Sequence, residues 1–300
     1  MNSIDIESKK FLGQPKNFVS IFNALLFDGK QVLKPEYLKD ENSELVMNVS
    51  SKHVDIIKRY EDGTYLDLFV IESQSYVDLS MVARVMEYES VARMRYIRQN
   101  FKKHIPMHTR LPMILTVVLY VGESKWNAAK RLSELEIIHP GFEDMFNEFK
   151  LNLIELNTNH KYNTGEKATQ DFFDLLRMIY RKQILKEDLD REFNRDALYF
   201  AYVVTKNKEL LNIYQESEKG DVKVCRALDE MFEESTNKGI QMGIKQGIEQ
   251  GIEQGVERGA KNTQIKIAIK MLVRNNQTLE EISEIVGLDL DALRELKKNI

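Results

Sequence analysis

The nine-residue segment 113–121 (MILTVVLYV) is apolar along its whole length except for one threonine. A strand with one face in water alternates apolar and polar residues, whereas a strand covered on both faces is an almost continuous apolar run. A membrane span needs about 20 apolar residues, roughly twice this length. We therefore predict a strand near the centre of a sheet that is covered on both faces, and no membrane span at this segment.

Neighbouring segments predict the other strands of this sheet and the helices that cover it. Hydrophobic spacing predicts a first helix at 17–26, a long helix at 78–101, and strands at 52–60, 65–72 and 151–156. Between the first two strands, Asp62 and Gly63 form the Asp-Gly pair that favours a two-residue hairpin turn. The predicted fold class is α/β, with a mixed sheet and helical layers in about the first 160 residues.

The rest of the chain has a helical pattern, and its composition changes near residue 237. Six of the fourteen glycines, from Gly239 to Gly259, recur every four residues. Farther on, Thr278 and Glu281 have the spacing of a capping box, and Gly287 separates two short helices. We predict four parts: a core domain at 1–165, a helical extension at 166–236, a glycine-repeat helix or tether at 237–261, and a small helical tail at 262–300.

Composition narrows the class of protein. The formal net charge is -4, which argues against a protein that only coats nucleic acid, because such proteins are usually basic. Cys225 is the single cysteine, so a disulfide framework and a cysteine zinc site are excluded, and a reducing compartment fits. The first ten residues lack the basic and apolar segments of a secretory signal. We predict a cytoplasmic protein without membrane association.

Two carboxylates lie among apolar residues in the predicted hairpin. With a turn centred on residues 62 and 63, Asp55 would pair with Val70, and Glu72 would be its diagonal neighbour on the same face, with Cα atoms roughly 7–8 Å apart. Gln74 would continue that face if the strand ran so far. Buried carboxylates are costly without a metal or donors, and oxygen ligands suit Mg²⁺. The alternative is the solvated face of a strand, which the spacing alone favours.

Four motifs add a family resemblance: Leu26-Phe27-Asp28-Gly29-Lys30, Asp55-Ile56-Ile57-Lys58, Ile71-Glu72-Ser73-Gln74, and Asp78-x-x-Met81-x-x-Arg84-x-x-x-Tyr88. They resemble the PD-(D/E)xK nucleases. Over nearly the whole chain, the match is closer to the Rpn family of recombination-promoting nucleases, also described as putative transposases. The glycine repeat and short helical tail resemble those of its relatives.

The resemblance implies a restriction-endonuclease-like core and DNA cleavage with Mg²⁺, or with Mn²⁺ in its place. It also implies a role in DNA recombination, mobile elements or defence. Asp55 and Glu72 would be metal ligands, and Gln74 stands where the wider superfamily has lysine. Ser73 departs from the asparagine that relatives often show. A glutamine can orient water or hold phosphate, but it cannot supply a positive charge.

Other polar residues are weaker candidates. Relatives often add an acidic or amide group from the first helix, which makes Asn23 an auxiliary candidate, with Glu44 as its alternative. The segment 81–110 contains seven basic and two acidic residues. Arg84, Tyr88, Arg95 and Arg98 recur at combinations of three- and four-residue spacing and would form one stripe along a helix. We predict that Arg84, Arg95 and Arg98 of this stripe contact the DNA backbone. The alternative is a solvated helix face with pairs such as Glu89 and Arg93.

The predicted function is a metal-dependent endodeoxyribonuclease. A catalytically inactive DNA-binding or scaffold protein that keeps the nuclease fold is the alternative, and RNA is a third substrate class. The glycine repeat predicts either a helix for self-association, giving a homo-oligomer, or a loosely helical tether.

Overall fold

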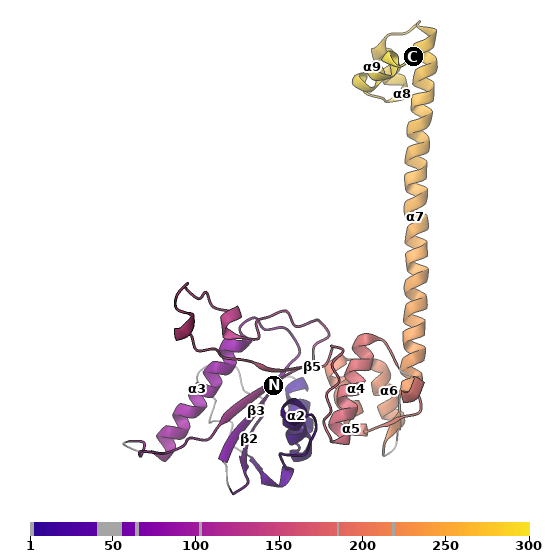
Figure 1. Ribbon diagram of the computed structural model, residues 1–300. Helices are drawn as coiled ribbons and strands as arrows, with labels where there is room; N and C mark the ends of the chain where they lie inside the picture. Colours follow the sequence, from indigo (N-terminus) through magenta and orange to yellow (C-terminus); the bar gives the residue numbers. More distant parts are fainter. Residues whose placement is uncertain (1–2, 41–55, 64–65, 102–103, 185, 218–219) are drawn as a thin grey trace. The chain divides into compact units, whose positions relative to one another are not determined.

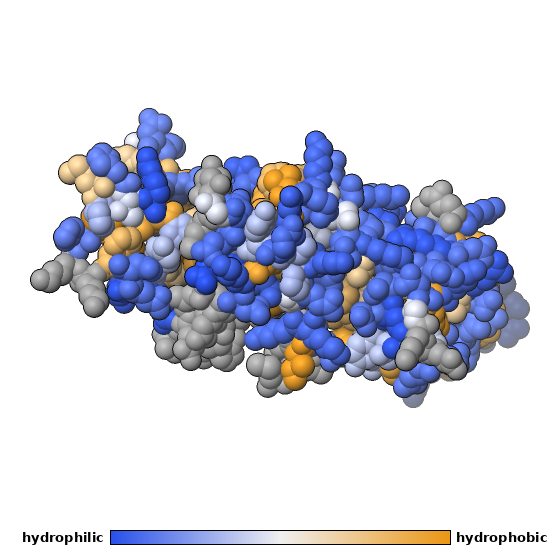
Figure 2. All heavy atoms as spheres, turned by 90° about the horizontal axis from the view of Figure 1, so that it is seen from below, coloured by the Kyte–Doolittle hydropathy of each residue, from blue (hydrophilic) through white to orange (hydrophobic). Residues whose placement is uncertain are grey.

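The computed structural model describes residues 3–40, 56–63, 66–101, 104–184, 186–217 and 220–300 (Figure 1). The chain separates into two compact units, Met1–Phe232 and Glu233–Ile300. The face drawn in Figure 2 is mostly hydrophilic, with separate small areas of apolar side chains. Among the described residues, no helix combines the length and the apolar character required to cross a membrane.

A five-stranded sheet forms the centre of the first unit. Its strands, in spatial order, are β1 (Leu38–Asp40), β2 (Ile56–Glu61), β3 (Leu66–Gln74), β4 (Ile114–Tyr120) and β5 (Asn152–Glu155). The pairs β1–β2 and β2–β3 are antiparallel, whereas β3–β4 and β4–β5 are parallel. The predicted mixed sheet is therefore confirmed, and the apolar segment at 113–121 forms an inner strand, β4.

The hairpin register differs from the prediction. Ile56 pairs with Ile71 and Glu61 pairs with Leu66, so the connection spans residues 62–65 and the ladder is shifted by two positions. The two-residue turn was wrong because Gly63, with φ +89°, fits a longer loop as readily as a tight turn. A shift of two keeps every side chain of β3 on its predicted face, since strand side chains alternate with a period of two.

Helices cover both faces of the sheet (Figure 1). On one face, α3 (Met81–Asn100) places Tyr88 and Ala92 against Leu68 and Val70 of β3. On the other face, α2 (Pro15–Phe27) packs Phe22 against the sheet. A helix that the sequence pattern did not indicate, α1 (Ser3–Leu12), precedes α2, so the predicted first helix is the second.

The helices after residue 165 share one apolar core with the sheet. They are α4 (Lys167–Arg181), α5 (Arg195–Thr205), α6 (Lys208–Glu216) and the beginning of α7 (Cys225–Arg274). Phe172 of α4, Phe200 of α5 and Leu228 of α7 belong to the same buried cluster as Ile71 of β3. Residue 165 therefore marks a change of secondary structure and not the edge of a separate core.

Short elements complete the first unit: β6 (Glu192–Phe193), β7 (Val222–Lys223), and the 3₁₀ helices η1 (Pro35–Tyr37), η3 (Leu132–Glu134), η4 (Glu143–Met145) and η5 (Lys186–Asp188). The strands β6 and β7 pair with each other as an antiparallel ladder.

The second unit consists of most of α7, followed by α8 (Leu279–Val286) and α9 (Leu290–Lys298). Ala268, Leu272, Ile282, Val286 and Leu293 form its buried core. The capping box at Thr278 is confirmed, and Gly287 ends α8 with φ +71°. The glycine repeat lies inside α7, which is helical over all 50 of its residues. This α/β core followed by a helical C-terminal region confirms the predicted fold class.

Candidate active site

Glu72 and Gln74 lie on one face at the carboxyl end of β3. They continue the series Leu68 and Val70, whose side chains point toward α3, because alternate residues of a strand share a face. Both are buried although both are polar, so the solvated-face alternative is wrong for these two positions. The prediction that Gln74 continues the face of Glu72 is confirmed, since β3 extends to Gln74.

Two donors meet on a single oxygen of Glu72. The Gln74 Nε2 and the Arg84 Nη2 each donate to Glu72 Oε1 at 2.9 Å. The Glu72 side chain is 3% exposed. A carboxylate so deeply buried is costly unless donors and an opposite charge compensate it, and the guanidinium supplies both.

Arg84 is held from three sides near the start of α3. In addition to its bond with Glu72, Nη1 donates to Asp78 Oδ2 at 2.5 Å, and Nε and Nη2 donate to the Tyr88 hydroxyl at 3.0 and 2.7 Å. Asp78 itself accepts bonds from the Ser80 backbone and hydroxyl. The network therefore joins β3, the loop after it and the first two turns of α3.

Charge and burial oppose each other in this network. Burial disfavours the charged guanidinium, but bonds to Tyr88 and Asp78 outweigh it and hold the pKa of Arg84 above its ordinary value. Burial likewise acts to raise the pKa of Asp78, yet hydrogen bonds from Ser80 and Arg84 prevail and lower it. Burial raises the pKa of Tyr88. Arg84 and Asp78 are thus a charged pair, and Tyr88 is a neutral hydroxyl.

Arg84 was predicted as a contact for DNA, and that contact stays a prediction. Its side chain is 13% exposed and its guanidinium is bonded inside the protein, so it belongs to the site around Glu72 and not to an open basic stripe. Asp78 and Tyr88 were part of the family motif but were not predicted as site residues. The signal that could have identified Tyr88 is its four-residue spacing from Arg84 on one helix.

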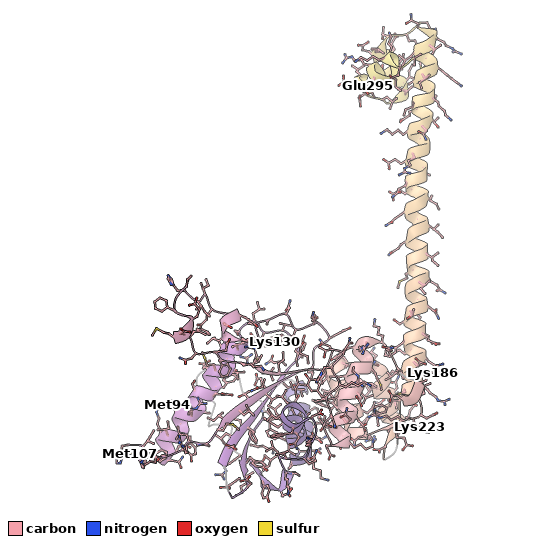
Figure 3. The ribbon with its side chains drawn as sticks, viewed as in Figure 1. Met94, Met107, Lys130, Lys186, Lys223 and Glu295 are labelled. Carbon is pink, nitrogen blue, oxygen red and sulfur yellow. The ribbon has the colours of Figure 1, made fainter. Side chains whose placement is uncertain are left out.

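The remaining basic residues of the proposed stripe lie farther along α3. Arg98 is exposed and Arg95 is half-buried. Met94, labelled in Figure 3, is an exposed apolar residue next to Arg95. Tyr88 is buried against the sheet, so the exposed part of the stripe begins after it. The DNA contacts of Arg95 and Arg98 stay predictions.

The two auxiliary candidates have different outcomes. Asn23 is buried in α2, and its amide both donates to the Leu33 carbonyl oxygen and accepts from the Leu33 amide at 2.9 Å. These bonds give Asn23 a structural role between α2 and the segment after it, and its auxiliary role in the site stays a prediction. Glu44 lies outside the described residues, and so does Asp55.

Oxygen atoms at this edge of the sheet are ligands that suit a hard cation. Glu72 offers a carboxylate and Gln74 an amide oxygen, which are ligand types that Mg²⁺ accepts. A carboxylate can only accept, so the Gln74 nitrogen must face Glu72 and its oxygen is turned away from that bond. Among the described residues there is no cluster of three acidic, histidine or cysteine side chains that could enclose a metal ion. The metal pair of Asp55 and Glu72 stays a prediction.

Other buried charges have structural partners. Glu89 of α3 accepts a bond from the Thr116 backbone of β4 at 3.0 Å, and burial raises its pKa. Lys130, labelled in Figure 3, donates to Glu155 at the end of β5. Asp171 of α4 binds Arg191 at 2.6 Å and accepts from the Asn194 backbone at 2.7 Å. These contacts join elements together and lie outside the Glu72 network.

Comparison with known proteins gives a family and no closer relative. No curated protein and no solved structure matches the chain. A family model with the description "Putative transposase, YhgA-like" matches residues 9–210. The matched region contains the sheet, Glu72, Gln74 and Arg84, and it ends before the glycine repeat. This result confirms the family resemblance that the motifs indicated, and the chain belongs to the YhgA-like family of putative transposases.

Proposed function

We propose that the chain is a divalent-metal-dependent DNA endonuclease that acts in recombination, mobile-element or defence biology. The observation that carries the proposal is the buried cluster of Glu72, Gln74 and Arg84 at the carboxyl end of β3. In sheets with parallel strands this edge is where ligands bind, and here it combines oxygen donors with a fixed cation. Membership of a transposase family makes DNA the expected substrate.

The second metal ligand of the proposal is Asp55. It directly precedes Ile56 in the sequence, and Ile56 pairs with Ile71, the residue before Glu72. Asp55 and Glu72 would hold Mg²⁺, or Mn²⁺ in its place, which when bound polarises a phosphate oxygen and lowers the pKa of water. Gln74 would orient the attacking water through its amide oxygen.

The reaction is the hydrolysis of one phosphodiester. The water oxygen forms a new bond to phosphorus, one ester P–O bond breaks, and the departing oxygen takes up a proton, which leaves a phosphate monoester and a hydroxyl. Arg95 and Arg98 would contact backbone phosphates away from the reacting one, as sequence-independent contacts whose strength falls with salt.

Nicking of supercoiled plasmid DNA by the full chain tests the proposal. Cleavage should require Mg²⁺ or Mn²⁺ and stop in EDTA. Glu72→Gln and Asp55→Asn should each lower the cleavage rate by more than about 100-fold. Even the loss of a residue that hydrogen-bonds to a metal ligand lowers activity by up to about 100-fold, and loss of the ligand itself should lower it further. Glu89→Gln is the matched control, because Glu89 is a buried carboxylate of α3 outside the network, and it should keep the parent rate.

Three outcomes would overturn the proposal or move it to an alternative. Cleavage that persists in EDTA, or in a folded Glu72→Gln protein at the parent rate, contradicts the metal site. DNA binding without cleavage under any metal supports the inactive scaffold that keeps the nuclease fold. Preferential cleavage of RNA in a parallel assay changes the substrate class.

A further inference from the structure

The strand residues of the proposed site supply no positive charge. Glu72 is acidic, and Gln74 carries a neutral amide that cannot offset an anion. Hydrolysis of a phosphodiester places additional negative charge on the phosphate oxygens in the transition state, where fixed donors act most strongly. The cation bonded to Glu72 comes from a different element, α3, in the form of Arg84 at 2.9 Å.

The guanidinium of Arg84 is fixed before any substrate arrives. Asp78 binds Nη1, and the Tyr88 hydroxyl binds Nε and Nη2. Four hydrogen bonds use four of its five N–H groups, which leaves one Nη1 hydrogen without an acceptor among the described residues. A side chain that is 13% exposed can still be reached by a ligand at its edge.

A guanidinium in this position suits a phosphate. The one Nη1 hydrogen that is left can donate to a single phosphate oxygen, and the guanidinium keeps its charge at every pH at which the protein is folded. Because the charge is desolvated and already oriented, little reorganisation is required when a phosphate binds.

We propose that Arg84 is a catalytic residue whose guanidinium donates to a non-bridging oxygen of the scissile phosphate and supplies the positive charge that Gln74 lacks. Asp78 and Tyr88 are positioning residues that hold the guanidinium beside Glu72. The inference rests on the proposed nuclease function, and it extends that function by assigning the cation of the site to α3.

Two measurements on the full chain test the assignment. The first is plasmid nicking with Mg²⁺, in which Arg84→Met should be slower by on the order of 100-fold, the usual cost of losing one transition-state donor. Arg84→Lys keeps the charge without the fork and should recover part of this rate. Tyr88→Phe should slow nicking less than Arg84→Met does, because the guanidinium stays but is held less firmly.

The second measurement is the affinity for a fluorescent DNA duplex as a function of salt, with Ca²⁺ and again with EDTA. Arg84→Met should lose one phosphate contact, and the steepness of log affinity against log salt should therefore fall by about one. Arg84→Lys and Tyr88→Phe should keep the parent slope. A side chain with a purely structural role would leave the slope unchanged when it is replaced.

Arg177 provides the matched control. It is a similarly buried arginine, 15% exposed, and it is paired with Asp174 at 2.8 Å in α4. Arg177→Met should change neither the nicking rate nor the salt slope. The inference is overturned if folded Arg84→Met keeps both parent values. If Arg84→Met does not fold, the other two variants decide. The inference is overturned if Arg84→Lys and Tyr88→Phe both nick DNA at the parent rate.

The two proposals fail in different ways. A parent protein that nicks no DNA with any metal refutes the nuclease, yet the salt slope still reports whether Arg84 contacts a phosphate. A parent protein that nicks DNA while Arg84→Met is equally active refutes the role of Arg84 and leaves the nuclease standing.

Discussion

Replacing all six glycines of the repeat in α7 with alanine should stabilise that helix. A Cβ added at any position from Gly239 to Gly259 would meet no heavy atom within 4 Å, and the backbone there is already helical. Glycine inside a helix costs about 1 kcal/mol relative to alanine because its unfolded state has more freedom to lose. The six changes together should favour the helix by about 6 kcal/mol.

Hydrogen exchange measured by mass spectrometry is the appropriate assay, because it reports the opening of one segment. A single change such as Gly247→Ala should slow exchange of the neighbouring amides about fivefold, and the sixfold variant should slow it much more. Ala260→Gly in the same helix should speed exchange by a similar factor. Gly141→Ala also has open space around it, but the residue has φ +91°, so this change should destabilise its loop.

Unchanged or faster exchange in the sixfold variant would refute the reasoning. It would mean that the segment is not helical in solution, or that the glycine face is in close contact with another chain. Five aliphatic side chains recur every four residues beside the glycines and are 54–67% exposed: Ile240, Ile244, Ile248, Ile252 and Val256. Self-association through this segment stays a prediction. Sedimentation of the parent and the variant separates the two cases, since methyl groups on the glycine face would weaken a close contact between copies.

Three further predictions concern buried or capping residues. Burial raises the pKa of the Cys225 thiol to about 12, so a thiol reagent near pH 8 should label the folded chain slowly. The chain unfolded in denaturant should be labelled completely, and rapid labelling of the folded chain would contradict the prediction. Burial also raises the pKa of Glu89, so its ionisation costs stability as the pH rises through the folded-state value. Glu89→Gln should therefore raise the Tm near pH 8, with the gain disappearing below about pH 4; a lower Tm near pH 8 would count against it. Thr278→Ala removes the bond to the Glu281 amide and should cost about 1 kcal/mol, seen as faster exchange in α8, and unchanged exchange would show that the cap contributes little.

Local patterns in the sequence predicted the elements whose signal is strong and repeated. The alternation along β3 correctly placed Glu72 and Gln74 on one face, and the spacing of Thr278 and Glu281 correctly predicted the start of α8. In each case the information lies within a few residues, so the period of a strand or the capping preference of a helix is sufficient.

Features that depend on distant contacts were not predictable. The strand β1 has three residues, too few to show a period, and it exists because it pairs with β2. Helix spacing put Tyr88 on a surface stripe, whereas packing against Leu68 of β3 buries it. Arg84 looked like a surface cation for the same reason, since the sequence does not show that Glu72 and Asp78 lie within reach of its guanidinium.

The topology explains why Arg84 meets Glu72. Because β3 and β4 are parallel, the chain must cross the sheet between them, and α3 is part of that crossover. Six residues separate Gln74 from Met81, so α3 begins close to the carboxyl end of β3. A long side chain in its first turns, directed back toward the helix start, therefore reaches the last inward-facing residues of the strand. The same connection carries Asp78, so the strand end, the loop and the helix start together fix one cation between two carboxylates.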